Sequence, residues 1–204
     1  MFKKIASDAL GLSDIGKIIK KEDFDKAQSD DFVLTEDGEK IYFLIKSKSD
    51  EYCFTNRALI HLDGDKATSN KRYIYRYDYY QHPIKNVSVE TAGTIDLDLE
   101  IKFHIGDHYL SIDIAKDEGE AIADLYKSLV AISQIQEEND RMSAFAKDSI
   151  GIAQNLLHDN RFHESDLSRE FNESANFAYD WFKQTYKENT RKDFDDVFEK
   201  YIQN

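Results

Sequence analysis

The side chains best suited to chemistry form an acidic row within residues 95–105. Asp96, Asp98 and Glu100 alternate with apolar residues, so a β-strand would place all three carboxylates on one face. Neighbours on such a face stand roughly 6.5–7 Å apart, so a bound metal ion would need ligands from other strands as well. The pattern therefore favours a solvated sheet face over a metal site or a pair of catalytic carboxylates.

Two histidines and a calcium-like loop are further candidates. His104 and His108 flank a turn and could face each other across a hairpin, but two imidazoles without a third ligand favour a structural role. Asp63 and Asp65 begin a calcium-loop pattern that breaks at Ala67, where the motif needs an acid or asparagine. We therefore expect no metal site.

Cys53 is the only cysteine in the sequence, which excludes an intramolecular disulfide. Its place between Tyr52 and Phe54 favours a small buried hydrophobic residue over a nucleophile. The sequence has no glycine-rich phosphate loop, no Gly-x-Ser-x-Gly elbow and no His-Glu-x-x-His helix. We expect no catalytic residues and no cofactor, and we do not expect an enzyme.

The acidic row belongs to the clearest strand pattern in the chain. Its opposite, apolar face carries Ile95, Leu97, Leu99, Ile101, Phe103 and Ile105. Six other segments between residues 32 and 115 have the composition of short strands: 41–45, 52–55, 58–62, 71–80, 84–89 and 109–115. Seven short strands separated by tight turns predict a small barrel or two packed sheets.

Helical periodicity flanks these strands on both sides. Residues 1–31 predict short helical pieces, including one over 13–19. One apolar stripe predicts a helix that begins near Asp117, ends by 136 and covers the barrel mouth; its residues are Ile122, Leu125, Leu129 and Ile132. Residues 137–204 carry two more stripes around a polar break at 158–165, which predicts an antiparallel helical hairpin. Residues 194–202 continue its second helix or begin a third.

Composition narrows the range of partners and locations. The 204 residues carry a net charge of −13, which disfavours nucleic acid and anionic membranes as partners, because both attract clustered basic residues. A hydrophobic content of 41% argues against wholesale disorder. No apolar run reaches the length of a secretory signal or a membrane span, so we expect a cytoplasmic protein.

Three segments together resemble the bacterial pleckstrin-homology-like (PH-like) domain family. They are Thr-Asn-Arg-Ala-Leu-Ile at 55–60, the tyrosine-rich stretch at 71–80, and residues 89–101 with their Glu-Thr-Ala-Gly sequence and acidic strand. The likeness spans about 32–136, and residues 137–204 resemble the YvbH-like oligomerisation extension of some members. The resemblance implies an α+β fold, in which a helix caps a seven-stranded curved β-barrel and a helical hairpin follows. It also implies assembly into rings, and it carries over no catalytic residues.

Our first hypothesis is a non-enzymatic interaction module that forms a homo-oligomer. The apolar stripes of residues 137–204 exceed what one hairpin can bury, so intersubunit packing is expected. The candidate contacts are Phe171, Phe182, Phe194 and Phe198. Other protein partners are compatible with the same role.

The alternative hypothesis is a ligand-binding or membrane-headgroup-binding module that uses the barrel mouth. Its candidate residues are Lys46, Lys48, Lys71 and Arg72. Eukaryotic PH domains that hold phosphoinositides use a basic loop between their first two strands. In the matching loop here, Asp50 and Glu51 offset the two lysines, which argues against a lipid headgroup.

Overall fold

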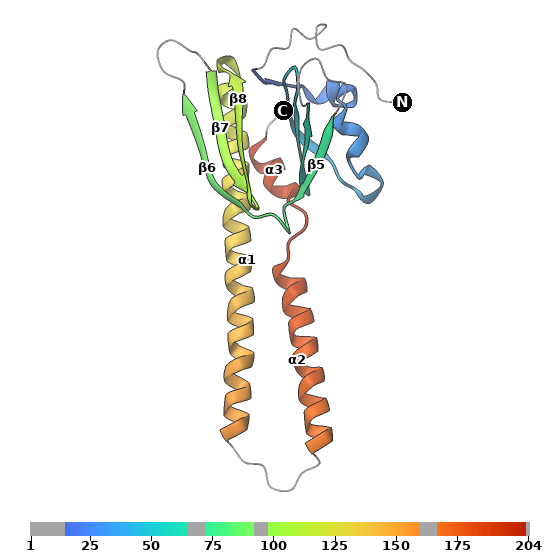
Figure 1. Ribbon diagram of the computed structural model, residues 1–204, viewed down its shortest axis with the longest axis vertical. Helices are drawn as coiled ribbons and strands as arrows, with labels where there is room; N and C mark the ends of the chain where they lie inside the picture. The colour runs from blue at the N-terminus through green and yellow to red at the C-terminus, as the bar shows by residue number, and fades with distance from the viewer. Residues whose placement is uncertain (1–14, 65–71, 92–97, 160–166, 203–204) are drawn as a thin grey trace. The chain divides into compact units, whose positions relative to one another are not determined.

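The alternating segments of the sequence form two antiparallel β-sheets (Figure 1). They belong to a computed structural model that describes residues 15–64, 72–91, 98–159 and 167–202. The strand order is β1-β2-β3-β4-β5 in one sheet and β6-β7-β8 in the other. The strands are β1 (Lys17–Ile18), β2 (Ile41–Lys46), β3 (Glu51–Thr55), β4 (Ala58–Asp63), β5 (Tyr73–Asp78), β6 (Ile84–Thr91), β7 (Asp98–Ile105) and β8 (His108–Ala115). Each of the seven predicted strands has a counterpart, and β1 is additional.

The described residues divide into two compact units. Unit 1 takes in residues 1–134 and 192–204, and unit 2 takes in residues 135–191. Both sheets lie in unit 1, whereas unit 2 is helical, so the chain has the α+β fold expected from its sequence.

Backbone pairing joins the two sheets along one edge. Gly16 forms an isolated parallel bridge with Ile114 of β8, and its N–H donates to the Asp113 carbonyl at 2.8 Å. Within the described ranges no strand pairing joins β5 to β6 at the other edge. The predicted barrel is therefore a pair of curved sheets that stays open between these two strands.

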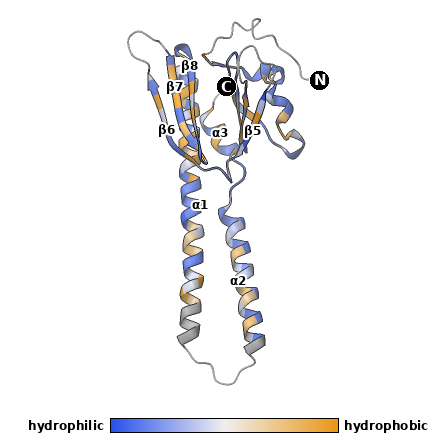
Figure 2. Cartoon of the chain, in the orientation of Figure 1, coloured by the Kyte–Doolittle hydropathy of each residue, from blue (hydrophilic) through white to orange (hydrophobic). Residues whose placement is uncertain are grey.

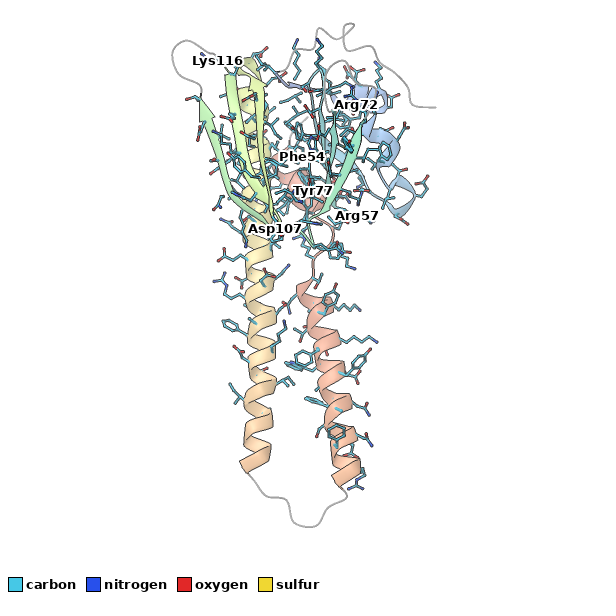
Figure 3. All side chains as sticks on the ribbon, viewed as in Figure 1. Phe54, Arg57, Arg72, Tyr77, Asp107 and Lys116 are labelled. Carbon is cyan, nitrogen blue, oxygen red and sulfur yellow. The ribbon has the colours of Figure 1, made fainter. Side chains whose placement is uncertain are left out.

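The facing apolar sides of the sheets pack on each other and on the first turns of α1 (Gly119–Asp159). Phe54 of β3 and Phe103 of β7 are fully buried, with ring centroids 6.3 Å apart, and Figure 3 shows Phe54 between the sheets. The predicted stripe of α1 is buried: Ile122, Leu125, Leu129 and Ile132. Their spacing places them on one face of the helix, so the predicted capping helix is confirmed.

The N-terminal segment covers the other face of the five-stranded sheet. Its contact cluster consists of Phe24, Ala27, Val33, Leu44, Cys53, Ile60 and Leu62. Cys53 is fully buried there, on the opposite side of β3 from Phe54. Burial raises the pKa of its thiol, so the thiolate that a nucleophile requires does not form near neutral pH. Cys53 acts as a small core residue.

The N-terminal segment is less helical than its sequence predicts. The helix expected over 13–19 is wrong where the structure describes it: β1 pairs with β2, and the Ile19 N–H donates to the Leu44 carbonyl at 2.9 Å. Pairing satisfies an otherwise open edge of β2, which outweighs a weak helical pattern interrupted by Gly16. Short 3₁₀ helices follow: η2 (Lys21–Lys26), η3 (Ser29–Phe32) and η4 (Thr35–Asp37).

Helix α1 does not end where the sequence pattern predicted. A 3₁₀ turn, η5 (Lys116–Glu118), leads into α1, which continues without a break to Asp159. The expected boundary at 136–137 therefore falls inside one helix. The polar run that begins at Glu137 interrupts the apolar stripe but contains no helix breaker, so the helix leaves the core of unit 1 and continues into unit 2.

The last part of the chain returns to unit 1. Helix α2 (Leu167–Asn189) belongs to unit 2, whereas α3 (Asp195–Tyr201) belongs to unit 1. Residues 194–202 thus begin a third helix. Among the described residues no helix combines the length and apolar composition needed to cross a membrane.

Candidate functional site

The described residues of unit 2 form no apolar core of their own. Every buried hydrophobic residue that the structure describes lies in unit 1, and none lies within residues 135–191. Unit 2 instead exposes a set of large side chains that we term the hairpin surface: Met142, Phe145, Ile152, Phe171, Phe177, Tyr179, Trp181, Phe182 and Tyr186. Figure 2 shows apolar residues recurring along both helices. Because isolated helices are only marginally stable in water, this surface needs a partner.

The two helices of unit 2 touch each other sparingly. The Trp181 indole N–H donates to the Ala146 carbonyl at 3.4 Å, and the Trp181 ring stacks on Phe177 with centroids 6.4 Å apart. A pocket of about 440 Å³ is lined by residues from both helices: Ser143, Lys147, Phe182, Thr185 and Tyr186. The hairpin is therefore incompletely packed along its inner side as well.

Sequence reasoning identified only part of the hairpin surface. Phe171 is 73% exposed and Phe182 is partly exposed on α2, as the self-association hypothesis requires. Helical spacing in this part of the sequence indicates the stripe Ala146, Ile150, Ala153 and Leu157, which leaves out Phe145 and Ile152. The signal was available, since positions 145 and 152 are seven residues apart and so return to one helix face.

The other two predicted contact residues lie elsewhere. Phe194 and Phe198 are fully buried in unit 1, where Phe194 meets the Tyr79 ring edge-on and Phe198 stacks on Tyr42, with centroids 5.8 Å and 5.2 Å apart. Their assignment to a self-association surface is corrected here, because their rings fill the core of the chain's own sheet unit. Sequence spacing could not separate the two roles, since both aromatic stripes have helical period.

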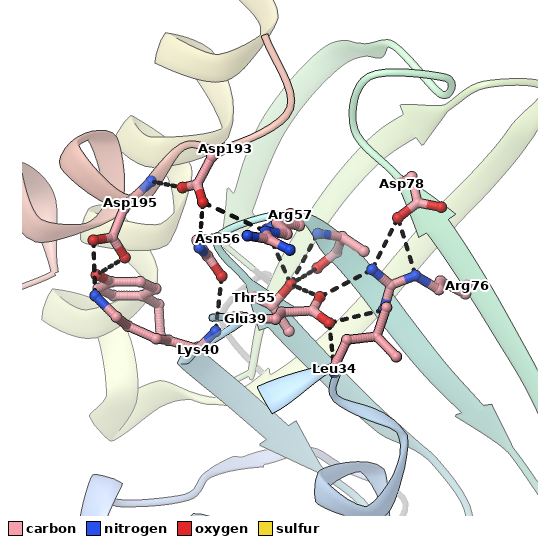
Figure 4. A network of polar contacts seen from close by, with 12 residues as sticks. Leu34, Glu39, Lys40, Thr55, Asn56, Arg57, Arg76, Asp78, Asp193 and Asp195 are labelled. Carbon is pink, nitrogen blue, oxygen red and sulfur yellow. Dashed lines mark hydrogen bonds and ion pairs between the residues drawn. The ribbon is translucent and has the colours of Figure 1, made fainter. Parts of the chain in front are cut away.

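Polar contacts fasten the same terminal segment, and Figure 4 shows them in close-up. Asp193 accepts a hydrogen bond from the Asn56 amide at 2.8 Å, and the Phe194 N–H donates to the Asn56 carbonyl at 2.8 Å. Asp195 accepts from the Tyr42 hydroxyl at 2.5 Å and from Lys40 at 2.9 Å. We call residues 192–202, held by these contacts, the C-terminal clasp.

The four basic residues of the alternative hypothesis do not form one open cluster. Lys46 is buried and forms an ion pair with Glu51, which also accepts the Ser29 N–H at 2.9 Å. Lys48 is exposed, and Arg72 donates to the Ser49 carbonyl at 2.9 Å. Lys71 lies outside the described residues. Lys46 is thus paired with an internal carboxylate, and of the three described residues only Lys48 and Arg72 remain at the loop between β2 and β3.

That loop is organised by its own polar groups. The Ser47 hydroxyl accepts the Asp50 N–H at 3.0 Å, and His61 Nε2 lies 3.5 Å from an Asp50 carboxylate oxygen. Burial opposes ionisation of Asp50, but the nearby His61 imidazole and a hydrogen bond from the Ser49 hydroxyl outweigh it and lower the pKa of this carboxyl. The loop therefore carries a fixed negative charge beside Lys48, which weakens it as an anion site.

The described residues of the acidic row lie on the second sheet, where Glu100 forms surface ion pairs and hydrogen bonds. Glu100 accepts a hydrogen bond from Ser111 and pairs with Lys102 at 2.8 Å, and Lys102 also pairs with Glu90 at 2.7 Å. These partners lower the pKa of Glu100, with Lys102 the larger influence. Asp96 lies outside the described residues. Across the described ranges, no three histidine, cysteine or acidic residues are grouped to hold a metal ion.

The two histidines beside the Gly106 turn do not face each other. His104 is the cross-strand partner of Tyr109, and His108 is the partner of Ile105. Neighbouring residues of a strand point to opposite faces, so the two imidazoles lie on opposite sides of the sheet. The His108 ring packs 4.9 Å from Tyr77, centroid to centroid, whereas His104 packs on Tyr109. Asp65, the second acid of the calcium-like pattern, lies outside the described residues.

Comparison with protein families matches the two structural regions separately. Residues 9–133 match the model of the bacterial PH domain. The chain belongs to the bacterial PH-domain family. Beyond this PH domain, residues 144–204 match the YvbH-like oligomerisation region. That match includes most of unit 2 and also the C-terminal clasp, which packs on the PH domain.

Individual relatives extend the similarity over the whole chain. YvbH of Bacillus subtilis (strain 168), an uncharacterized protein, is 52% identical over 204 residues, and the similarity covers 100% of both chains. YjqA of the same bacterium is 36% identical over 99 residues, which are 47% of this chain and 76% of YjqA. The crystal structure of a PH-domain-containing protein from Exiguobacterium sibiricum 255-15 is 48% identical and has a TM-score of 0.83. It covers 93% of this chain and 100% of its own. This likeness confirms the PH-like fold.

Proposed function

We propose that this protein is a homo-oligomeric assembly module whose copies associate through the hairpin surface. The observation that carries the proposal is that unit 2 exposes nine large hydrophobic side chains and buries none among the residues described. Solvent-exposed aromatic residues at this density mark a surface that is covered in the working protein. The match of residues 144–204 to an oligomerisation region supports a second copy of the chain as the cover.

The PH domain then acts as the scaffold that each copy contributes, without a catalytic role. Cys53 is buried as a thiol and Glu100 is paired at the surface, so neither supplies the reactive group of a recognisable catalytic site. The net charge of −13 supports a protein partner rather than nucleic acid or an anionic membrane. We place this module in the cytoplasm as part of the same proposal.

Light scattering after size exclusion tests the proposal on the full chain at micromolar concentration. We expect a defined oligomer for the natural sequence and dissociation for the double variant Phe145→Ser/Phe177→Ser, which removes one exposed ring from each helix. Loss of two buried interface anchors should weaken association by about 2–4 kcal/mol each, or roughly 30- to 1000-fold per site.

The matched control is Tyr109→Ser, which removes an exposed ring from β8 of unit 1. It should leave the oligomer unchanged. A monomeric natural chain would refute the proposal, and so would equal dissociation of the control and the double variant. Far-ultraviolet circular dichroism of each variant shows whether unit 1 remains folded, since both sheets belong to that unit.

A further inference from the structure

A pocket of about 230 Å³ lies in unit 1, where the N-terminal segment pairs with the end of β2. Its apolar lining comes from Ile18, Ile19 and Ala27. Among the described residues, its charged lining consists of four lysines and one aspartate: Lys17, Lys20, Lys26, Lys46 and Asp23. In a chain of net charge −13, such a concentration of lysines around an apolar floor is a local exception.

Two of the four lysines are already neutralised. Lys26 pairs with Asp23, and Lys46 pairs with Glu51. Within the described part of the chain, Lys17 and Lys20 form no ion pair with an acidic side chain. As far as the described residues go, the pocket therefore presents two positive charges, at Lys17 and Lys20, that no acidic side chain compensates.

The strand register places Lys17 in a position where its positive charge is destabilising. Lys17 of β1 lies directly opposite Lys46 of β2, and Lys46 lies opposite Glu51 of β3. Like charges in directly opposed positions destabilise a pair of antiparallel strands. Glu51 offsets the charge of Lys46 from the far side, whereas no acidic side chain in the described ranges pairs with Lys17. An anion bound in the pocket would supply the missing negative charge.

We infer that this pocket binds a small amphiphilic organic anion, with its carboxylate at Lys17 and Lys20 and its short apolar chain on Ile18, Ile19 and Ala27. The volume of about 230 Å³ is large enough for a six-carbon carboxylate. The cationic pair holds the head group, and burial of the chain adds apolar contact. The inference does not depend on self-association, because these residues belong to unit 1.

The test uses the full chain at low salt and hexanoate as the probe. We expect hexanoate to raise the melting temperature in a saturable manner, because a ligand that binds only the folded state stabilises it. In ¹⁵N-resolved spectra, the amides of residues 16–27 and 44–46 should shift along the same binding curve. Hexanol and hexylammonium share the chain but lack the negative charge, and neither should bind.

The double variant Lys17→Gln/Lys20→Gln separates a site from a folding defect. Without ligand its melting temperature should equal or exceed that of the natural chain, because the opposed charge at Lys17 is gone. Its affinity for hexanoate should fall by at least about tenfold, since two charge-assisted hydrogen bonds are lost. The control Lys85→Gln/Lys116→Gln makes the same change in net charge at exposed positions and should bind normally.

Several outcomes would overturn the inference. Equal binding of hexanol would show that the carboxylate is not recognised, and equal binding of inorganic phosphate would show that the apolar lining contributes nothing. If the control variant lost as much affinity for hexanoate as Lys17→Gln/Lys20→Gln, the loss would be due to net charge alone and not to the pocket. Binding to phosphatidylglycerol vesicles without a response to hexanoate would indicate a membrane surface instead. Light scattering of Lys17→Gln/Lys20→Gln should match the natural chain, which keeps this test distinct from that of the hairpin.

Discussion

Glu39 illustrates at the residue scale how unit 1 accommodates a buried charge. Its side chain is fully buried, and its two oxygens accept hydrogen bonds from the Arg76 guanidinium, each at 3.1 Å (Figure 4). The Thr55 hydroxyl and the Leu34 N–H complete its partners, at 2.5 Å and 2.8 Å. A buried carboxylate is tolerated when it is paired and fully hydrogen-bonded, as this one is.

Replacing Glu39 by alanine should therefore lower the free energy of unfolding by about 2–4 kcal/mol, because the Leu34 N–H and the Thr55 hydroxyl lose their acceptor and Arg76 is left with its pairing to Asp78 at 2.9 Å. The midpoint of urea unfolding measures the change. Glu90→Ala removes an exposed carboxylate paired with Lys102 and should cost no more than about 1 kcal/mol. Similar losses in both variants would contradict this account of Glu39.

Asp195 should make the C-terminal clasp sensitive to acid. Hydrogen bonds from Tyr42 and Lys40 lower the pKa of this carboxyl in the folded chain. A group with a lowered folded pKa stabilises the fold above its unfolded pKa, and this stabilisation is lost as the pH falls through the folded value. We expect the melting temperature to drop between about pH 5 and pH 3, and less so in Asp195→Asn. Asp180→Asn, an exposed change on α2, should keep the natural profile; a flattened profile there would exclude Asp195 as the cause.

At the element scale, Gly16 and the adjoining strand β1 join the two sheets along one edge, because the Gly16 backbone lies close to β8. A Cβ atom at Gly16 would lie 2.7 Å from the Ile45 side chain and 3.0 Å from the Asp113 carbonyl. The backbone of β8 could move away from such a Cβ only by breaking the bridge between Gly16 and Ile114. Residue 16 must therefore be glycine, because the space between the two sheets has no room for a side chain.

Gly16→Ala should destabilise unit 1 by about 1–3 kcal/mol, as overpacking of a filled site does. Gly151→Ala is the matched change inside α1, where a new Cβ meets nothing within 4 Å. There the higher helix propensity of alanine should leave stability unchanged or raise it by about 0.5–1 kcal/mol. Urea titration of both variants checks the contrast, and a neutral Gly16→Ala would show that the edge is not tightly closed.

The same elements show what the sequence can and cannot predict. Strand β7 and the first turns of α1 were predicted because each has one buried face, which imposes a clear period on the residues. Strand β1 was not, because two residues carry no period and their pairing depends on an edge that is distant in sequence. The end of the capping helix was misplaced because a polar run indicates exposure rather than helix termination.

The candidate sites follow the same rule. Exposure of Phe171 and burial of Phe198 depend on tertiary contacts, so equal helical spacing could not distinguish them. The occupation of Lys46 by Glu51 was equally hidden, because a charged side chain in a strand is normally solvated.

At the scale of the whole molecule, the helical hairpin is an insertion within unit 1. The chain leaves unit 1 after Gln134 along α1 and returns to it at Lys192. The clasp that follows contributes two fully buried rings, Phe194 and Phe198. Removal of all residues after Gln136 would therefore take away part of the core of unit 1 together with the hairpin.

Phe198→Ala should lower the free energy of unfolding by about 3–5 kcal/mol through the cavity it leaves. A chain that ends at Arg191 loses both rings and the clasp, and it should fail to fold at 37 °C, because natural domains have only about 5–15 kcal/mol of stability. Calorimetry and urea titration measure the two effects. Tyr126→Ala, on the exposed side of α1, should change stability by less than about 0.5 kcal/mol. A folded chain ending at Arg191 would contradict a structural role for the clasp.

The return of the chain to unit 1 also sets the order of events during synthesis. Residues 135–191 take about 3–11 s to translate at about 5–20 residues per second. During this interval the two sheets have been synthesised, but Phe194 and Phe198 of their core have not. Unit 1 therefore completes its core only after the hairpin has been synthesised. Under the proposed self-association, neighbouring chains on one messenger would meet through the hairpin surface while their cores are still incomplete, so assembly would precede the last step of folding.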